Sequence, residues 1–467
     1  MRVCWQSELQ LDVSRIVELL QEFGSLLPDP LSERLDLDAY ARKILAHADI
    51  AFAFIDKTIV GMVVLYANDT ETRAAHVPMI TVAPFARRKG VGVALMSRAM
   101  ALARQRKMHS LNLTVLKENS AAIAMYRGLR FRDVSRDGAR IVLQAELPPT
   151  RDPASVLPTA LEPCPELAAA FGLDIDLKIK RDDLYPMSGG GIKARKIQYI
   201  LQDAVTKGHD VIVTNGGPQS NHARATAVEA ARLGLKCHII VVMEPGRSYP
   251  DAGNILLMRL SGATLEYRRK DQLARAMDRA VSAYAEGGFN PLYLWGGGHC
   301  LPGTVAFAEA AAEAQRQTPA WSPDFLILAS GTGSTQAGLA IGYAHLKTRV
   351  IGISVARDAA RGGAIVRDSV EEYRNAFKMP TSPSVEFMDD WVDGGYEQAG
   401  EALLEITRTA ARAGMFLDTT YSGKGWHGLV GLVKQGLIPA GSKVLFWHTG
   451  GLMNLQAGPL RGKDNSL

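Results

Sequence analysis

The chain of 467 residues is about three times the usual length of one domain, so its length predicts two or three domains, each with its own core. Hydrophobic residues make up 47% and charged residues 22%, as in soluble globular proteins, and no apolar run reaches the roughly 18 residues that a membrane-spanning helix needs. A formal net charge of +5, with no block of basic residues, gives no reason to expect a nucleic-acid partner.

Two further features argue against a secreted or metal-binding protein. The stretch MRVCWQSELQLDVS lacks the basic-then-apolar layout of a signal peptide, so a cytoplasmic location is expected. The four cysteines lie far apart without a Cys-x-x-Cys pair, and the adjacent His299 and Cys300 have no partners at ligand spacing. We therefore expect reduced thiols and no metal site.

A proline-rich stretch divides the chain. Residues 146–165, ELPPTRDPASVLPTALEPCP, contain six prolines among polar residues, a composition that disfavours helices and strands alike. We predict a first domain at 1–147, a linker at 148–165 and a second domain at 166–467. In the second domain, strand-like runs such as DVIVTNG, FLILASG and KVLFWHTGG alternate with alanine-rich helical stretches, the pattern of a parallel α/β sheet.

In the first domain, MITVAPFARRKGVGVALMSRAMALARQRK predicts a short strand, a basic loop with glycines and a helix. Arg87, Gly90 and Gly92 lie at the junction of strand and helix. Glycines let the backbone approach an anion, and a helix N-terminus offers N–H groups and a positive dipole end, so this junction is a candidate diphosphate site. A dinucleotide-binding loop would need a third glycine where the chain has Leu95, which disfavours that alternative.

Residues 50–147 resemble the GNAT acetyltransferase superfamily, which has a mixed α+β fold. The loop just described matches its Arg/Gln-x-x-Gly-x-Gly/Ala motif, and LKENSAAIAMYRGLRF supplies its later asparagine, Asn119, and tyrosine, Tyr126. The resemblance implies acetyl-CoA as co-substrate, with backbone contacts from Val82 onward. It also implies that Tyr126 protonates the leaving thiolate of coenzyme A.

Two alternatives stay open for the first domain. In one, Tyr126 is only a core aromatic residue on an alanine-rich helix. In the other, the domain binds acetyl-CoA without chemistry and regulates the second domain as a sensor. The lack of an obvious general base favours the sensor, since His76 is a lone histidine near the start of a strand and is not chosen as the base.

In the second domain, SGGGIKARKIQYI places three glycines just before Ile192 and Lys193, and Lys196 follows three residues later. A lysine amine attacks an aldehyde only when it is deprotonated, and small neighbouring residues let a bulky planar aldehyde approach it. An aldehyde cofactor of this kind also needs a cradle for its phosphate, a partner for its ring nitrogen and a group for the substrate carboxylate.

All three requirements have candidates at the ends of predicted strands. The loop in LILASGTGSTQAGLAIG can offer N–H and hydroxyl donors to a phosphate from Gly331, Thr332, Gly333, Ser334 and Thr335. Thr449, at the end of VLFWHTGG, can bond a pyridine nitrogen. Ser220, Asn221 and His222, in VTNGGPQSNHARA, precede a helix N-terminus that can hold a carboxylate.

Residues 150–455 resemble the fold-type II pyridoxal-phosphate enzymes, and among them the branch of D-cysteine desulfhydrase and 1-aminocyclopropane-1-carboxylate deaminase. Five motifs stand in family order: LKIKRDDLYPMSGGGIKARKIQYI, GPQSNHAR, ASGTGSTQAG, YSGKGWHGL and FWHTGG. The resemblance implies pyridoxal 5'-phosphate as cofactor and two parallel-sheet α/β subdomains, the smaller one inserted at about 200–310. It also implies a homodimer formed through this domain.

The same resemblance assigns roles to single residues. It implies that Lys193, not Lys196, forms the Schiff base with the cofactor. The residues that it places around the substrate and the cofactor ring are Ser220, Asn221, Tyr421, Tyr396, Gln219 and His222.

Departures from the family pattern bear on the substrate. The asparagine before the lysine is Ile192 here. The cyclopropane deaminases carry Tyr-Glu-Gly where this chain has the run that begins with Tyr421 and Ser422, and glutamine where it has His222. Both changes favour the desulfhydrase side over ring-opening deamination.

We therefore expect α,β-elimination, with deamination, of a small β-substituted amino acid. A neutral Thr449 beside the ring weakens the electron sink, which favours substrates with a leaving group. The alternative is β-replacement or racemisation, because the product then keeps an amine that the first domain can acetylate, whereas elimination leaves a 2-oxo acid without one. A pseudoenzyme would have lost Lys193, the phosphate loop or Thr449, all of which are present.

Overall fold

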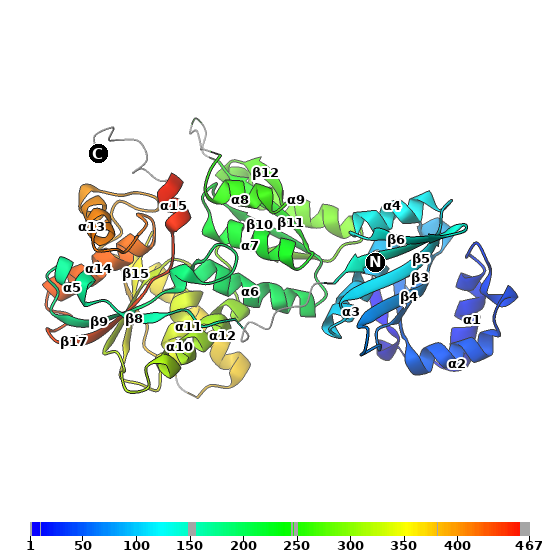
Figure 1. Cartoon of the computed structure of the whole chain (residues 1–467), viewed down its shortest axis with the longest axis horizontal. Coiled ribbons are helices and arrows are strands. Elements are labelled where there is room, and N and C mark those ends of the chain that lie inside the picture. The colour runs from blue at the N-terminus through cyan, green and yellow to red at the C-terminus, as the bar shows by residue number, and fades with distance from the viewer. Residues whose placement is uncertain are drawn as a thin grey trace.

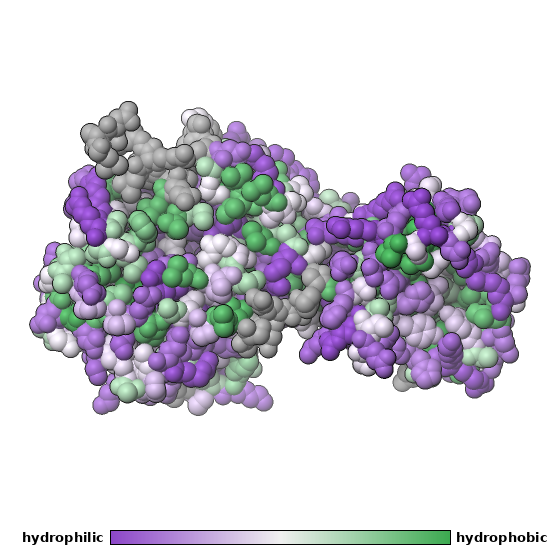
Figure 2. All heavy atoms as spheres, in the orientation of Figure 1, coloured by the Kyte–Doolittle hydropathy of each residue, from purple (hydrophilic) through white to green (hydrophobic). Residues whose placement is uncertain are grey.

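The computed structural model describes residues 2–9, 11–147, 156–243, 246, 251–380 and 382–457. Figure 1 shows the N-terminal part, in blue and cyan, beside the larger remainder of the chain, and Figure 2 shows a narrower waist between the two. The linker predicted at 148–165 falls partly on residues 148–155, which lie outside the described residues.

The N-terminal part is built on a seven-stranded sheet in the order β1-β2-β3-β4-β5-β7-β6. Its strands are β1 (Arg2–Trp5), β2 (Asp49–Ile55), β3 (Thr58–Tyr66), β4 (Ala74–Val82), β5 (Ser110–Leu116), β6 (Arg132–Asp137) and β7 (Arg140–Glu146). Its helices are α1 (Val13–Gly24), α2 (Leu37–His47), α3 (Val91–Gln105) and α4 (Ser120–Gly128), with short 3-10 turns η1 (Gln6–Glu8), η2 (Leu31–Glu33) and η3 (Pro84–Ala86). This mixed sheet confirms the predicted α+β class.

Helix starts in this part follow from local hydrogen bonds. The side chain of Asp12 accepts the backbone N–H of Arg15 at 2.8 Å and caps α1, and the apolar residues of α1 recur at helical spacing and are buried. Asn119 caps α4 in the same way, because its Oδ1 accepts the N–H of Ala122 at 3.2 Å. Such caps satisfy backbone donors that a helix start leaves without partners.

The parallel strands β4 and β5 pair over only part of their length. Their register runs from Ala74 opposite Ser110 to Val77 opposite Leu113 and then stops. Beyond that point β4 continues to Val82, paired only with β3 on its other side. The two strands therefore diverge and leave a gap in the middle of the sheet.

The C-terminal part contains two largely parallel sheets, as predicted. One has four strands in the order β12-β11-β10-β13, all parallel: β10 (Val211–Gly216), β11 (Lys236–Val242), β12 (Thr264–Arg268) and β13 (Pro291–Leu294). The other has six strands in the order β16-β15-β14-β17-β9-β8, parallel except for β8: β8 (Leu161–Pro163), β9 (Ile175–Lys180), β14 (Phe325–Ser330), β15 (Arg349–Ser354), β16 (Glu386–Met388) and β17 (Ser442–Trp447).

Helices surround both sheets (Figure 1). They are α5 (Pro165–Ala170), α6 (Gly191–Thr206), α7 (Asn221–Arg232), α8 (Asn254–Leu260), α9 (Leu273–Glu286), α10 (Leu301–Gln317), α11 (Ser334–Tyr343), α12 (Ala359–Phe377), α13 (Glu401–Arg412), α14 (Ser422–Lys434) and α15 (Leu452–Ala457). Two short 3-10 turns, η5 (Asp182–Leu184) and η6 (Lys270–Gln272), complete the set. Within the described ranges, no helix is long and apolar enough to cross a bilayer.

The two parts meet where α3 packs against α6 and against the turn after α9. Phe289 packs onto the core of the N-terminal part. A β-carbon at Gly90 would come within 2.6 Å of the backbone of Gly287 and Gly288, and one at Gly288 would collide with the carbonyl oxygen of Gly90. We call this close backbone contact between Gly90 and Gly287–Gly288 the glycine junction.

Candidate active sites

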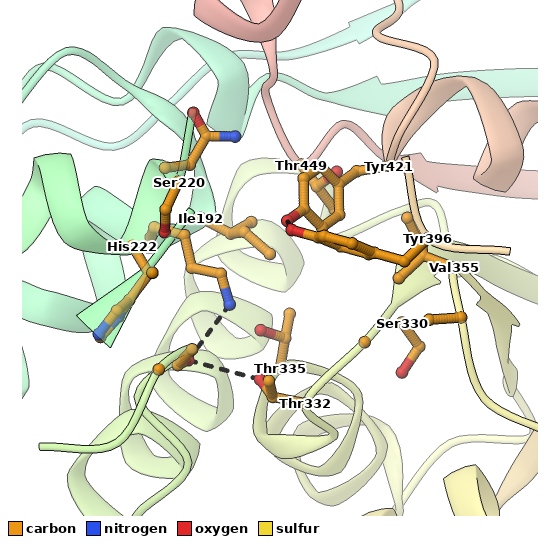
Figure 3. Close-up of a pocket in the computed structure, with 18 of the residues that line it drawn as sticks. Ile192, Ser220, His222, Ser330, Thr332, Thr335, Val355, Tyr396, Tyr421 and Thr449 are labelled. Atoms are coloured by element: carbon orange, nitrogen blue, oxygen red, sulfur yellow. Dashed lines mark hydrogen bonds between the residues drawn. The ribbon is translucent and has the colours of Figure 1, made fainter. Parts of the chain in front are cut away.

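A cavity of about 450 Å³ opens between the two sheets of the C-terminal part. It is lined by residues at or after the carboxyl ends of β10, β13, β14, β15 and β17, by the first turn of α6 and by the residue before α14. Loops at the carboxyl ends of parallel strands are where α/β proteins bind ligands. Because two such edges contribute here, donors from distant parts of the sequence meet in one space (Figure 3).

Lys193 lies in the first turn of α6 and lines this cavity. Its Nζ donates a hydrogen bond to the backbone oxygen of Gly297 at 3.2 Å. Burial lowers the pKa of Lys193 to about 8, and the charge of Arg357 acts in the same direction, whereas a contact with Lys196 opposes them. A larger share of this amine is therefore neutral at physiological pH than in a surface lysine, as a nucleophile requires.

Lys196, one turn further along α6, does not belong to the cavity lining. Its side chain is fully buried, and its Nζ donates to the Oγ of Ser334 at 2.8 Å. Burial and the charge of Lys193 lower the pKa of Lys196 well below its ordinary value. Lys193 is thus open to a ligand while Lys196 is tied to the start of α11, an arrangement that favours Lys193 as the aldehyde-reactive group.

The loop between β14 and α11 forms an anion cradle. Gly331, Thr332, Gly333 and Thr335 all line the cavity, and Figure 3 shows Thr332 and Thr335 side by side at its base. Gly333 has a φ of +88°, a conformation that favours glycine. The N-terminus of α11 and two hydroxyls together suit a phosphate. Ser334, which was also expected to bind the phosphate, does not line the cavity; its Oγ accepts the hydrogen bond from Lys196.

Thr449 follows β17 and lines the cavity next to Tyr421 (Figure 3). Its Oγ1 is buried and has no hydrogen-bond partner among the described residues. A buried hydroxyl without a partner costs about 1–3 kcal/mol, so its position points to a ligand atom as partner. The reactive lysine, the anion cradle and this neutral hydroxyl face one cavity, and the set fits pyridoxal phosphate.

Ser220, Asn221 and His222 also line the cavity, and Figure 3 shows Ser220 and His222 across from Tyr396. The Oγ of Ser220 accepts the N–H of Ala223 at 3.2 Å and caps α7. Burial and the charges of the two neighbouring lysines lower the pKa of His222 well below its ordinary value, so its ring is neutral. Its Nε2 hydrogen-bonds the Oγ1 of Thr214 at 2.8 Å, and its buried Nδ1 has no partner within the described part of the chain.

Gln219 does not line the cavity. Its Nε2 donates to the backbone oxygen of Ala252 at 2.9 Å, and its Oε1 accepts the N–H of Asn254 at 3.0 Å. The Nδ2 of Asn254 in turn donates to the Oδ1 of Asn221 at 3.0 Å. The expectation that Gln219 binds substrate is therefore not supported by its placement; it positions Asn254, which holds Asn221.

Tyr396 and Tyr421 come together although they are far apart in sequence. Their hydroxyl oxygens are 2.5 Å apart, and both rings line the cavity (Figure 3). Tyr396 is 49% exposed as a whole residue, but desolvation of its hydroxyl raises its pKa to about 12, and burial raises the pKa of Tyr421 well above its ordinary value. The carboxylate of Asp418 accepts the backbone N–H groups of Thr420, Tyr421 and Ser422 and so fixes this turn. Both phenols are therefore protonated at neutral pH, and the pair can donate a proton to a leaving group.

Sequence reasoning did not identify four residues of this site: Trp295, Arg357, Asn254 and Asp418. Trp295 and Arg357 line the cavity. They follow β13 and β15, so a search of every predicted strand end would have found both. Asn254 and Asp418 act from behind the lining, where no sequence pattern indicates them.

A second cavity, of about 180 Å³, lies in the N-terminal part where β4 and β5 diverge. Asn119 and Tyr126 both line it. Burial raises the pKa of Tyr126 to about 12, so its phenol is protonated at neutral pH and can act as an acid. The gap between the strands leaves one edge of β4 without a β5 partner beyond Val77, which suits the extended arm of coenzyme A.

The predicted diphosphate loop connects β4 to α3. The Nε of Arg87 donates to the backbone oxygen of Val82 at 3.1 Å and closes the turn. Gly90 has a φ of +78° and caps the helix, and a β-carbon at Gly92 would come within 2.9 Å of the sulfur of Met125. The start of this 15-residue helix thus carries no side chain at Gly90 or Gly92, but the backbone of Gly287–Gly288 packs against Gly90 on one side.

His76 lies on β4, is exposed and does not line the second cavity. Its position agrees with leaving it out as a general base. In the described ranges, no group of three or more His, Cys, Asp or Glu side chains is placed to hold a metal ion.

Comparison with known proteins places both parts in families. Residues 154–450 match the model of the pyridoxal-phosphate dependent enzyme family, and residues 15–131 match that of the acetyltransferase (GNAT) family. A 1-aminocyclopropane-1-carboxylate deaminase of Rhizobium leguminosarum bv. viciae is 34% identical over 320 residues, which are 64% of this chain and 94% of the relative. One of Rhizobium radiobacter is 33% identical over 322 residues, again 64% of this chain and 94% of the relative.

Solved structures also match the C-terminal part of the chain. The crystal structure of a homologue of 1-aminocyclopropane-1-carboxylate (ACC) deaminase superposes with a TM-score of 0.58 at 29% identity and covers 66% of this chain and 92% of its own. A pyridoxal 5'-phosphate-dependent aspartate racemase, at a TM-score of 0.50 and 14% identity, shares the fold and covers 66% of this chain and 94% of its own.

Proposed function

The chain belongs to the pyridoxal-phosphate dependent enzyme family and carries a GNAT acetyltransferase domain, and from this premise we propose a bifunctional enzyme of small amino acids. The C-terminal part catalyses α,β-elimination, with deamination, of a β-substituted amino acid. The N-terminal part transfers the acetyl group of acetyl-CoA to an amine. The observation that carries the first activity is the grouping, around one cavity, of Lys193, the Tyr396–Tyr421 pair and Thr449.

Pyridoxal phosphate, when bound, supplies the electron sink for the charge that develops at the substrate Cα. Lys193 would hold the cofactor, and its Nζ, when free, would take the α-proton of the substrate. Its lowered pKa keeps Nζ neutral and able to accept that proton. The anion cradle before α11 fixes the phosphate, so the ring stays in one orientation relative to Lys193.

The tyrosine pair serves the leaving group. Both phenols carry their proton at neutral pH, and the short contact lets Tyr396 replace a proton that Tyr421 gives away. A thiolate or hydroxide that departs from the β-carbon needs such a proton. The neutral Thr449 also fits elimination, because a weaker electron sink favours substrates in which the β-bond breaks readily.

The substrate carboxylate is assigned to the opposite wall. Ser220 and Asn221 lie at the N-terminus of the 12-residue helix α7, whose dipole attracts an anion. His222 lines the same wall as a neutral ring, so it offers no charge to a second anionic group. We therefore propose a substrate with one carboxylate and an uncharged β-substituent.

A second candidate follows from the fusion. Elimination leaves no amine on the organic product, whereas β-replacement or racemisation leaves one that the N-terminal part can acetylate. Tyr126 in the second cavity supports acetyl transfer, while a domain that only senses acetyl-CoA does not need a buried acid there. The relatives' printed activity, deamination of 1-aminocyclopropane-1-carboxylate, is a further competitor to test.

Mass spectrometry of products separates these schemes. The holoenzyme is incubated with D- and L-cysteine, D- and L-serine, their O-acetyl and β-chloro analogues, and 1-aminocyclopropane-1-carboxylate, each with and without acetyl-CoA. A 2-oxo acid and ammonia, independent of acetyl-CoA, support the elimination proposed. An inverted or substituted amino acid, N-acetylated when acetyl-CoA is present, supports the second candidate, and turnover of the cyclopropane substrate alone contradicts both.

A further inference from the structure

The cavity of the N-terminal part has a charged mouth. Beyond Asn119 and Tyr126, its lining includes the segment between α1 and η2, with Asp29, and the residue after η2, Arg34. Arg140, the first residue of β7, completes the mouth. These are the three charged side chains of the lining, and they come from three separate segments.

The three charges are linked but exposed. The Nη2 of Arg140 lies 2.7 Å from the Oδ2 of Asp29, and the Nη2 of Arg34 donates to the backbone oxygen of Asp29 at 3.1 Å. The side chains of Arg140 and Asp29 are 50% and 48% exposed, so this ion pair contributes little to stability. Two guanidinium groups against one carboxylate leave one positive charge in excess, and each guanidinium has five N–H donors, more than these contacts use.

The rest of the lining is apolar or neutral. It includes Leu27 and Pro28 on the same segment as Asp29, and Val77 and Val115 on the diverging strands. A ligand with a charged side chain would find no opposite charge there. A ligand with an uncharged side chain, one carboxylate and one ammonium group would match the whole cavity.

We propose that the acetyl acceptor is an α-amino acid with an uncharged side chain, whose carboxylate binds Arg34 and Arg140 and whose nitrogen lies beside Asp29. This rests on the N-acetylation proposed above. Guanidinium forks recognise a carboxylate through paired hydrogen bonds, and Asp29 is released from Arg140 to attract the ammonium group. A shared substrate class would explain why this site is joined to an amino-acid enzyme.

The reaction balances with these groups. The nitrogen–carbon bond forms as the carbon–sulfur bond of the thioester breaks, and the sulfur takes the phenol proton of Tyr126. The ammonium nitrogen releases two protons in all, of which one restores the phenol and the other reaches water. Asp29 orients the nitrogen and need not accept a proton permanently.

The test measures release of the coenzyme A thiol by the full-length holoenzyme with L- and D-alanine, leucine and phenylalanine and with their α-amides. These amino acids have no β leaving group, so the C-terminal part does not eliminate from them. We expect kcat/KM for the preferred amino acid to exceed that for its amide at least about tenfold, as for one hydrogen bond to a charged group. Equal use of acid and amide, or a preference for the amide, overturns the proposal.

Variants locate the carboxylate. Arg34→Gln and Arg140→Gln should each raise KM for the amino acid about tenfold, leave KM for acetyl-CoA unchanged and abolish the preference over the amide. Arg136→Gln is the control, because Arg136 is an exposed arginine that, like Arg140, pairs with an aspartate, Asp133, and it lies outside the cavity lining. Both Arg34 and Arg140 variants behaving like the Arg136 variant would overturn the assignment.

Failure of the underlying activity is recognised separately. If no acceptor releases coenzyme A although calorimetry shows that acetyl-CoA binds, the proposed N-acetylation fails. The amino-acid site is then judged by titrating leucine and leucinamide into the acetyl-CoA-loaded protein. Binding of leucine alone, lost in Arg140→Gln, supports the site, and equal or absent binding overturns it.

Discussion

The cavity of the C-terminal part and that of the N-terminal part differ in how they hold their polar groups. In the first, Lys193 and Tyr421 are partly buried and have shifted pKa values, and Thr449 has a buried hydroxyl without a partner among the described residues. In the second, Tyr126 is buried but the charges at the mouth are half exposed. The comparison supports the proposal that buried groups transfer protons in both cavities, whereas the half-exposed charges of the second select and orient its ligand.

The largest expected effect is the loss of the C-terminal activity, without loss of acetyl transfer, on substitution of Lys193. Lys193→Ala should lower the C-terminal activity by about three orders of magnitude or more, because the same amine holds the cofactor and takes the proton. Acetyl transfer should be unchanged. The products of both reactions are quantified for this variant and for Lys207→Ala, a control at an exposed lysine. A parallel loss of acetyl transfer would show that the two sites are not independent.

Tyr126→Phe tests the acid of the N-terminal cavity. We expect acetyl transfer to fall by roughly 10²–10⁴, the usual contribution of a positioned acid, while acetyl-CoA still binds. Thiol release and calorimetric titration of acetyl-CoA give the two quantities. If transfer persists at the wild-type rate, Tyr126 is a core aromatic residue and not the acid.

The pH dependence of cofactor uptake tests whether Lys193 is buried enough to have a lowered pKa. A lysine reacts as the neutral amine, and burial lowers the pKa of Lys193 to about 8. The rate at which cofactor-free protein takes up pyridoxal phosphate should therefore rise with pH and level off above about 8. Stopped-flow absorbance against pH gives the midpoint. A midpoint near the ordinary lysine value would mean that Nζ is hydrated.

Thr449→Val removes the buried hydroxyl while keeping the side-chain shape. The cofactor-free protein should unfold at the same temperature or slightly higher, since a group without a partner costs about 1–3 kcal/mol when buried. Elimination should slow about tenfold. Calorimetry of the cofactor-free form and turnover of the holoenzyme report the two effects, and a clear loss of stability without cofactor would show that Oγ1 has a partner in the protein.

The smallest effect on either activity is expected at the glycine junction. Gly288→Ala places a β-carbon against the carbonyl oxygen of Gly90, whereas Gly262→Ala introduces the same backbone strain, at φ of +77° against +83°, with no neighbour within 4 Å. The loss of unfolding free energy in Gly288→Ala minus that in Gly262→Ala gives the free-energy cost of separating the two parts. Small-angle scattering should show a longer molecule for Gly288→Ala only, and an unchanged envelope would mean that another contact holds the parts.

Sequence predicted the fold classes of both parts because strand–helix alternation and glycine loops are local patterns. It also predicted the lining where a motif ends a parallel strand, as for Ser220, Thr335 and Thr449, since such ends share one edge of a sheet. It could not predict that Gln219 turns away, because its partner Asn254 lies 35 residues further along. The domain boundaries, the homodimer and the cytoplasmic location stay predictions.

The glycine junction has a consequence for how such a chain can change over time. The loop before α3 and the turn after α9 are in backbone contact. A residue with a side chain can therefore replace a glycine in one of them only if the other moves away. α3 also packs on α6, the helix that bears Lys193 in its first turn. The two parts are therefore not interchangeable. An acetyltransferase domain taken from another protein would need a glycine at the position of Gly90 to pack here; without it, the domain would be joined to the C-terminal part by the linker alone.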